Sequence, residues 1–580
     1  MADGRGGPDD RLEALAITIM LTWSQLGHAS PKQSDLVRLA RSAPRDQLLR
    51  GLTMVATVLL NADNKAGGHS SPAHLAMAHA LLKNDLWETA NAGFQRRQWQ
   101  VFLSPEGYLL AIRAVVRFGK PRVAAPAALG DVLGELILTA NDLLDPGRSE
   151  VDIVGRVLRL WWFARQDQAR YALARYYSLL TANPDPSSAN YIDLDATFQA
   201  AAGGLSIREF VASAMFLYAM YSRYELPPDI ERHGFGNEWR TLAKRSRDHN
   251  KVFALQRLVL RSVPQVAREL RAAEPEFVYG YGELKPFLRA PFLKLSDGGV
   301  VPIWMPLLRD LAAEGPRWVL AEHLSRTAGT NAIKKLNAYL GARFEEQTVT
   351  LLRRCYLAQG PLRVLFPAEE YGTADEPKEG TDAVLTIGDA AVFFEMTITA
   401  PPAAALWSSS TVAFRKFLRG SLRQKLGKLE ACVRDYLDGR MTYLGPKPTY
   451  VRRVFPLLVT LQAYPANPVL SGLYSEVLEG FPLLSGSQLG DTGVRGLRFV
   501  TIEELEMLEG VLSAGQADLV ALLDEWCLTH PTGAVPFKNF LLLVKRFQEI
   551  PSSVLKEQFD QTARDMTSEI ARLFQLDEAT

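Results

Sequence analysis

A β-hairpin that brings two carboxylates together is the feature that most constrains the fold of this chain. Residues 382–397 read DAVLTIGDAAVFFEMT, two apolar runs that meet at Gly388-Asp389. Glycine at the first central position is typical of a two-residue type II′ turn, and such a turn fixes the register of the strands. That register places Asp382 directly opposite Glu395. The other predicted pairs are Ile387 with Ala390 and Leu385 with Val392.

Like charges opposite each other on a sheet repel, and a cation between them removes that cost. Converging oxygen ligands suit Mg²⁺ or Mn²⁺. The hairpin therefore predicts a site for metal-dependent phosphodiester chemistry. An Asp and a Glu on a solvated strand face are the alternative.

The whole chain has the composition of an ordinary globular protein. Its 580 residues are 47% apolar and 22% charged, which predicts about two to four domains. The formal net charge of +1 means that a nucleic-acid surface must be a local patch. Three widely spaced cysteines and no long apolar run fit a cytoplasmic protein without a membrane segment. A phosphate-binding GxxxxGK[ST] loop is absent, so an ATPase would have to be a separate partner.

The pattern of the chain changes near Pro275. The earlier part has apolar residues at helical spacing, and strands and helices alternate after it. The fold class expected is α plus α/β. The expected segments are a disordered start at 1–10, a helical sensing or docking domain at 11–272 with a division near 183–191, a β-rich connector at 273–330, a catalytic domain at 331–530 and a helical tail at 531–580.

The order of elements around the hairpin carries a resemblance. A helix containing Glu345 comes first, the two strands with Asp382 and Glu395 follow, and a helix from about 412 to 437 comes next. Over roughly 280–530 this order resembles the PD-(D/E)XK, or restriction-endonuclease-like, nuclease superfamily. The resemblance implies an α/β/α domain with a mixed central sheet.

By resemblance, Asp382 is the central metal-binding aspartate, Glu395 is the acid of the third motif and Glu345 is the acid of the first core helix. The backbone carbonyl of Met396 is a further expected ligand of one Mg²⁺ or Mn²⁺ ion. That ion would activate water for hydrolysis.

Position 397 departs from the family pattern. The family has a lysine two residues after the third-motif acid, and this chain has Thr397. Some members of the superfamily carry the lysine on the neighbouring helix, where Lys425 and Lys428 are the candidates. Gln424 on the same helix is a further candidate for the site.

The function implied by the resemblance is a nuclease, with DNA the favoured substrate. A large helical module joined to such a domain suggests the effector of a bacterial defence system with partner subunits, and a homo-oligomer is expected because many nucleases of this class pair two sites. The main alternative is a catalytically degenerate protein, marked by Thr397, that binds nucleic acid or serves as an assembly subunit. A helical scaffold with an unrelated α/β appendage is a third interpretation.

Two basic runs offer candidate nucleic-acid surfaces. One is the helix expected over 154–180, where arginines alternate with aromatic residues. The other covers 240–271 and contains few acids. In both runs the alternative is an ordinary amphipathic helix with a solvated basic face.

Overall fold

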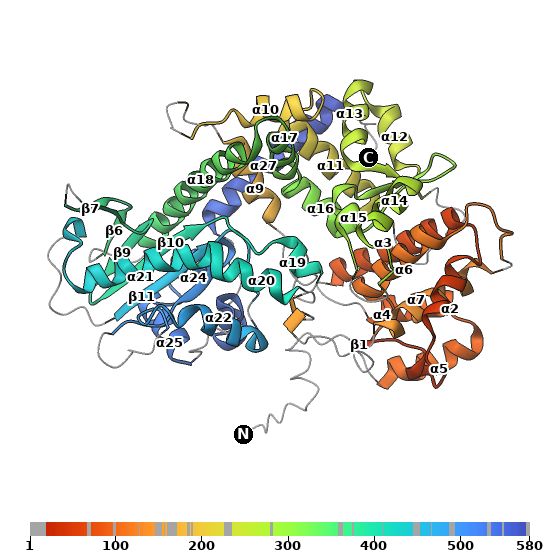
Figure 1. Cartoon of the computed structure of the whole chain (residues 1–580), viewed down its shortest axis with the longest axis horizontal. Helices are drawn as coiled ribbons and strands as arrows, with labels where there is room; N and C mark the ends of the chain where they lie inside the picture. Colours follow the sequence, from red (N-terminus) through yellow and green to blue (C-terminus); the bar gives the residue numbers. More distant parts are fainter. Residues whose placement is uncertain are drawn as a thin grey trace. The chain divides into compact units, whose positions relative to one another are not determined.

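The computed structural model of the protein contains two units, each formed by segments from different parts of the chain (Figure 1). The first unit comprises residues 1–151, 198–316 and 566–580, and the second comprises 152–197 and 317–565. The structure describes residues 19–66, 71–96, 100–126, 128–144, 154–155, 157–158, 171–182, 186, 190–224, 235–278, 282–357, 363–373, 376–408, 410–444, 453–465, 467–485, 493–529, 535–547, 550 and 552–575. The expected disordered start and, within the basic run over 154–180, residues 156 and 159–170 lie outside these residues.

The first unit is mainly helical. Local signals set its helix starts: Ser104 accepts a hydrogen bond from the Gly107 amide at the start of α6, and Ser206 and Glu209 form a capping box on α11. The helices are α2 (Gln33–Ala40), α3 (Arg45–Ala66), α4 (Ser71–Leu81), α5 (Asn84–Arg96), α6 (Pro105–Phe118), α7 (Leu129–Leu143), α11 (Ile207–Ser222), α12 (Glu238–Arg245), α13 (His249–Val259), α14 (Val263–Ala273), α15 (Lys285–Arg289) and α16 (Met305–Ala313). Helix α10 (Leu194–Ala201) crosses the division between the units.

Two small sheets complete this unit. Strands β1 (Ile19–Met20) and β2 (Gln100–Val101) pair in parallel. Strand β4 (Phe292–Lys294) pairs with β3 (Leu260–Ser262) and β5 (Val300–Pro302).

The connector expected at 273–330 needs correction. Its strands, β4 and β5, belong to the first unit, whereas residues 331–530, where the catalytic domain was expected, belong to the second. Residues 285–289 of the expected connector form a short helix, α15, which has Pro286 in its first turn and buries Phe287 in the core.

The C-terminal residues close the first unit. The Arg247 amide donates to the Leu573 carbonyl, and the Gln575 amide donates to the Arg245 carbonyl at 2.7 Å. Arg572 also forms an ion pair with the buried carboxylate of Glu209. Residues more than 300 positions apart are thereby joined in one unit.

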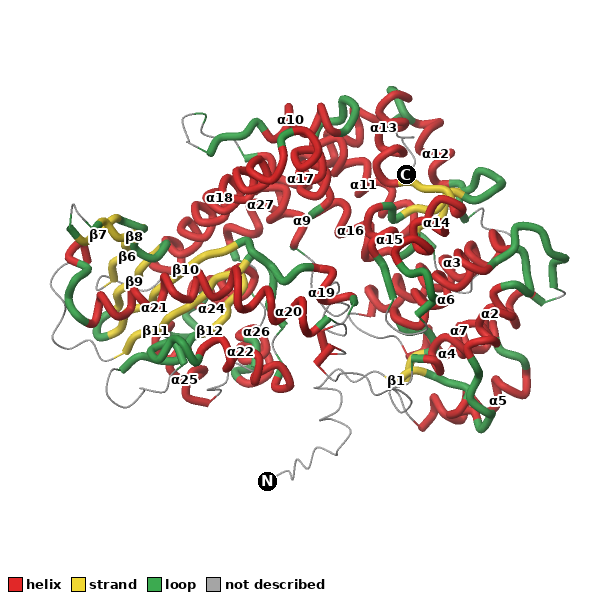
Figure 2. Tube along the Cα trace, in the orientation of Figure 1, coloured by secondary structure: helices red, strands yellow, loops and turns green. Residues whose placement is uncertain are grey.

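The second unit is built around a mixed five-stranded sheet (Figure 2). The strand order is β12 (Arg498–Thr501), β11 (Arg453–Thr460), β10 (Ala390–Thr397), β9 (Ala383–Ile387) and β6 (Arg363–Pro367). Strands β10, β11 and β12 are parallel, whereas β9 is antiparallel to both of its neighbours. Every residue of β10 is buried, which explains its almost continuous apolar sequence.

Helices α18 and α21 contact the five-stranded sheet. Helix α21 packs on the sheet face that carries Phe393, whose ring meets that of Tyr436 at 5.2 Å. Helix α18 contacts β6, β10 and α24. The helices are α9 (Ala172–Thr181), α17 (Gly315–Thr327), α18 (Gly329–Leu357), α19 (Ala403–Trp407), α20 (Thr411–Phe417), α21 (Arg423–Leu437), α22 (Ser471–Leu478), α24 (Ile502–Ser513), α25 (Leu519–Thr529), α26 (Phe537–Asn539) and α27 (Ser553–Leu573).

A short ribbon and a π-helical turn complete the second unit. Strands β7 (Glu370–Gly372) and β8 (Pro377–Glu379) pair beside the site. The π-helical segment Leu418–Leu422 joins α20 to α21. No described helix of the chain combines the length and the apolar character needed to cross a bilayer.

The helical domain expected at 11–272 is divided between the two units. Helix α9 belongs to the second unit, where Arg175 forms a buried ion pair with Glu506 of α24. The expected tail is divided as well, since α27 begins in the second unit and its last residues belong to the first. A single sequence does not reveal such non-contiguous pairings.

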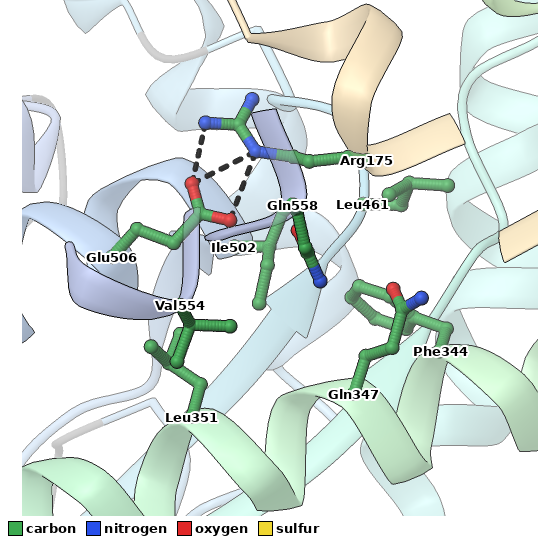
Figure 3. A pocket seen from close by; sticks show the side chains of 9 residues that line it. All are labelled: Arg175, Phe344, Gln347, Leu351, Leu461, Ile502, Glu506, Val554 and Gln558. Carbon is green, nitrogen blue, oxygen red and sulfur yellow. Dashed lines mark hydrogen bonds and ion pairs between the residues drawn. The ribbon is translucent and has the colours of Figure 1, made fainter. Parts of the chain in front are cut away.

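The ion pair borders a small pocket of the second unit (Figure 3). Arg175 Nε donates to both carboxylate oxygens of Glu506, at 3.1 and 2.8 Å. The remaining lining is mostly apolar or amide in character and comes from Phe344, Gln347, Leu351, Leu461, Ile502, Val554 and Gln558. The Arg175 guanidinium and the Glu506 carboxylate neutralise each other, so we assign the pair a structural role.

Candidate active site

The hairpin forms with the predicted register. Gly388 has φ +54°, as the first central residue of a type II′ turn requires, and Ile387 pairs with Ala390. The last given pair is Ala383 with Phe394. Asp382 directly precedes β9 and is therefore level with Glu395 on the same sheet face.

Both carboxylates are buried. Glu395 is 0% exposed and Asp382 is 6% exposed. The interpretation of these acids as a solvated strand face is therefore wrong. Two buried carboxylates side by side require compensating positive charge or hydrogen-bond donors.

The lysines of α21 supply that charge. Lys425 Nζ lies 2.6 Å from Glu395 Oε1. Lys428 Nζ lies 3.2 Å from Asp382 Oδ1 and 3.5 Å from Glu395 Oε2. The two lysines are three residues apart and share one face of the helix, which turns both amines toward the sheet.

Three of the four carboxylate oxygens accept a hydrogen bond, and Asp382 Oδ1 accepts its bond from Lys428 at 3.2 Å. Asp382 Oδ2 accepts a 2.6 Å hydrogen bond from the backbone amide of Met396. Glu395 Oε1 accepts from Lys425. Glu395 Oε2 is buried and accepts no hydrogen bond, although the Lys428 amine is within ion-pair distance.

Burial and the mutual charges of the acids and lysines set the pKa values in the site. Burial, and then the charge of Asp382, raises the pKa of Glu395 above its ordinary value, and the two lysines oppose this shift. Burial alone would lower the pKa of both lysines, but the two carboxylates outweigh it and raise the pKa of each. Both amines are therefore charged at neutral pH.

Glu345 lies near this group on α18. Burial raises its pKa to about 7, and the charge of Asp382 adds to the shift. No hydrogen bond joins Glu345 to the hairpin acids among the described residues. Glu345 is nevertheless close enough to Asp382 for the two charges to interact.

The acids fit a hard divalent ion. Within the described ranges no three His, Cys, Asp or Glu residues gather closely enough to form a complete ligand set. Mg²⁺ is usually held by only one or two carboxylates together with water and substrate phosphate. The unbonded, buried oxygen of Glu395 is an available acceptor for such an ion.

Three other positions named in the sequence analysis, Gln424, Thr397 and Met396, do not take the places expected of a metal or lysine site. Gln424 is exposed on α21, and no hydrogen bond connects it to either carboxylate in the described part of the chain. Thr397 is buried, and its hydroxyl accepts a 3.0 Å hydrogen bond from the Thr399 amide. The contact found for Met396 is made by its amide, whereas the sequence analysis proposed its carbonyl as a ligand.

Glu379 is a residue of the site that sequence analysis missed. It ends strand β8, and its Oε1 lies 3.3 Å from Lys428 Nζ. Its side chain is 71% exposed, unlike the two hairpin acids. The only sequence signal is its place three positions before Asp382.

Some basic residues in the described part of these runs make intramolecular contacts. Arg175 is buried against Glu506, and Lys251 pairs with Glu209. Arg271 donates to the Arg117 carbonyl. These contacts weaken the case for either run as a nucleic-acid surface.

Comparisons of the chain with protein-family models, curated proteins and solved structures give no match.

Proposed function

We propose that the chain is a metal-dependent nuclease that hydrolyses phosphodiester bonds, with DNA the favoured substrate. The observation that carries the proposal is the buried pair Asp382 and Glu395 with two lysine amines within 3.5 Å. Carboxylates that can hold a hard cation, next to a fixed positive charge, are the groups that phosphoryl chemistry requires.

The residues have separate tasks in this proposal. Asp382 and Glu395 would hold Mg²⁺ or Mn²⁺, and the Met396 amide fixes the orientation of the Asp382 carboxylate. A bound divalent ion lowers the pKa of an attacking water and stabilises charge on phosphate oxygens. Lys425, whose side chain is 31% exposed, would offer its charge to the same phosphate.

The helix that carries the lysines also supports a polyanionic substrate. Residues 411–429 contain six basic residues and no acid. Four of the six are exposed and form what we call the basic helix face: Arg415, Lys416, Arg419 and Arg423. Glu476 is close to two of them, at 3.3 to 3.4 Å. This face is continuous with the helix turn that bears Lys425, so it would guide a phosphate backbone toward the site.

A degenerate nuclease fold that only binds nucleic acid is the second candidate function. The observation in its favour is Thr397, which stands at the family's lysine position and has its hydroxyl engaged by Thr399. This candidate predicts nucleic-acid binding without cleavage. The role as a defence effector with partner subunits rests on the family resemblance alone.

A cleavage assay with Mg²⁺ or Mn²⁺ tests the proposal. Asp382→Asn and Glu395→Gln should each lower the cleavage rate by about 100-fold or more, because each removes a charge that holds the ion. Glu346→Gln is the matched control, since Glu346 neighbours Glu345 on α18 but is exposed. Unchanged cleavage in both hairpin variants, with normal thermal unfolding, would reject the assigned site.

A further inference from the structure

Lys428 is placed differently from Lys425 with respect to the two hairpin acids. Two of the four carboxylate oxygens have a partner of their own, the Met396 amide and Lys425. The other two are Asp382 Oδ1 and Glu395 Oε2, and both face Lys428 Nζ. One positive group therefore lies close to an oxygen of each of the two acids that would hold a divalent ion.

An ammonium group can replace the positive charge of such an ion. It is a compact charge on a flexible four-carbon stem, and it donates in several directions. Its separations of 3.2 and 3.5 Å are looser than that of Lys425 from Glu395, which is 2.6 Å. Lys428 is thus farther from each of its acids than Lys425 is from Glu395.

A nearby acid offers a second position for this amine. Glu379 Oε1 is already 3.3 Å from Lys428 Nζ, and its side chain reaches solvent. A small rotation of the Lys428 side chain would move its amine away from the buried oxygens of Asp382 and Glu395 and keep the ion pair with Glu379. Lys425 has no second acid among its ion pairs in the described residues.

We propose that Lys428 occupies the cation position between Asp382 and Glu395 and moves to Glu379 when a divalent metal ion binds. The inference rests on the proposed function, since it concerns the same metal site. Lys428 is then a tethered competitor of the metal, and Lys425 is the lysine that remains beside the phosphate. In the metal-free protein Lys428 relieves the repulsion between the two acids.

Calorimetric titration of the full chain with Mn²⁺, without nucleic acid, tests the competition. Lys428→Met should bind Mn²⁺ at least tenfold more tightly than the parent, because both a competitor and a like charge are removed. Lys425→Met is the matched control and should tighten binding by less than threefold, because only a like charge is removed. Equal effects of the two substitutions, or no Mn²⁺ binding by either the parent or Lys428→Met, would overturn the inference.

Amine labelling of the unsubstituted chain gives a second measurement that does not depend on a variant folding. Mn²⁺ should increase the labelling rate of Lys428 severalfold, measured by mass spectrometry, because the amine leaves the buried oxygens. Glu379→Gln should weaken Mn²⁺ binding, since the displaced amine loses its acceptor. A Lys428 labelling rate that Mn²⁺ leaves unchanged or lowers would contradict the displacement.

Failure of the inference and failure of the proposed function are distinguishable. Tighter Mn²⁺ binding by Lys428→Met without any cleavage by the parent chain would retain the displacement and reject the nuclease. Cleavage that depends on Asp382 and Glu395, together with equal effects of the two lysine substitutions on Mn²⁺ affinity, would retain the nuclease and reject the displacement.

Discussion

Lys425 and Glu395 lie thirty residues apart in the sequence, and the amine of one is 2.6 Å from a carboxylate oxygen of the other. The contact joins helix α21 to the central strand β10. The positive charge beside Glu395 therefore comes from a helix and not from strand position 397, where the chain has threonine. The position of the charge in space, and not its position in the sequence motif, is what matters to a phosphate.

Lys425→Met should lower the rate of metal-dependent cleavage by about 100-fold, because the charge beside the phosphate is lost. Lys556→Met, which removes an exposed lysine of α27, should leave the rate unchanged. Single-turnover cleavage at saturating Mn²⁺ measures the effect apart from metal affinity. A rate within twofold of the parent would show that Lys425 is not needed for the reaction.

Glu345→Gln should stabilise the protein at high pH. Burial raises the pKa of Glu345 to about 7 in the folded protein, compared with 4.5 for an unperturbed glutamate. Between these values the folded state binds more protons than the unfolded state, so the stability contributed by this group falls as the pH rises. Removing the charge should therefore increase the free energy of unfolding at pH 8 more than at pH 5, by about 1 to 2 kcal/mol after allowance for partial exposure.

Urea unfolding of both proteins at the two pH values measures this difference. Glu346→Gln, on the exposed side of the same helix, should show no such pH dependence. A Glu345→Gln effect that is identical at the two values would contradict the raised pKa.

Arg175→Met should destabilise the protein by about 3 to 5 kcal/mol, because it leaves Glu506 buried without its partner. The double substitution Arg175→Met/Glu506→Met should cost less than Arg175→Met alone, since no unpaired charge remains. Arg354→Met is the control, because Arg354 pairs with exposed Glu557 and should cost about 1 kcal/mol or less. Chemical unfolding of the parent and the three variants measures these differences. An Arg175→Met protein as stable as the parent would show that the buried pair is dispensable.

Replacing three arginines of the basic helix face should weaken nucleic-acid binding. Arg415→Gln/Arg419→Gln/Arg423→Gln should also reduce the dependence of binding on salt, by about 0.9 in the logarithmic slope for each lost phosphate contact on duplex DNA. Fluorescence anisotropy over a range of salt concentrations measures both quantities. Arg564→Gln, at an exposed position of α27, is the control, and equal slopes for the triple variant and the parent would exclude this face.

The local elements around the site could be predicted from the sequence. The hairpin register followed from Gly388 and from the strand pattern, and both are local signals. The helix predicted around Glu345 corresponds to α18, and the helix predicted from about 412 to 437 corresponds to α20 and α21 with the π-helical segment between them. Their apolar periodicity and length were sufficient evidence.

Long-range partners could not be predicted in this way. Glu379 reaches Lys428 only because the short ribbon β7–β8 folds back beside α21, and no local pattern encodes that contact. The division of the expected helical domain depends equally on distant pairs such as Arg175 with Glu506. A single sequence gives the tendency of each segment, whereas the choice among distant partners depends on packing across the whole fold.

The contacts of residues 572–575 with the first unit have a consequence for how the chain acquires its structure during synthesis. Residues 572–575 supply the partners of the Glu209 side chain and of the Arg245 and Arg247 backbone. These partners are translated more than 300 codons later. The first unit therefore cannot form all of its contacts on the ribosome before residues 572–575 have been translated. Deleting these residues should leave α11 and α12 without the contacts that Glu209, Arg245 and Arg247 make with them.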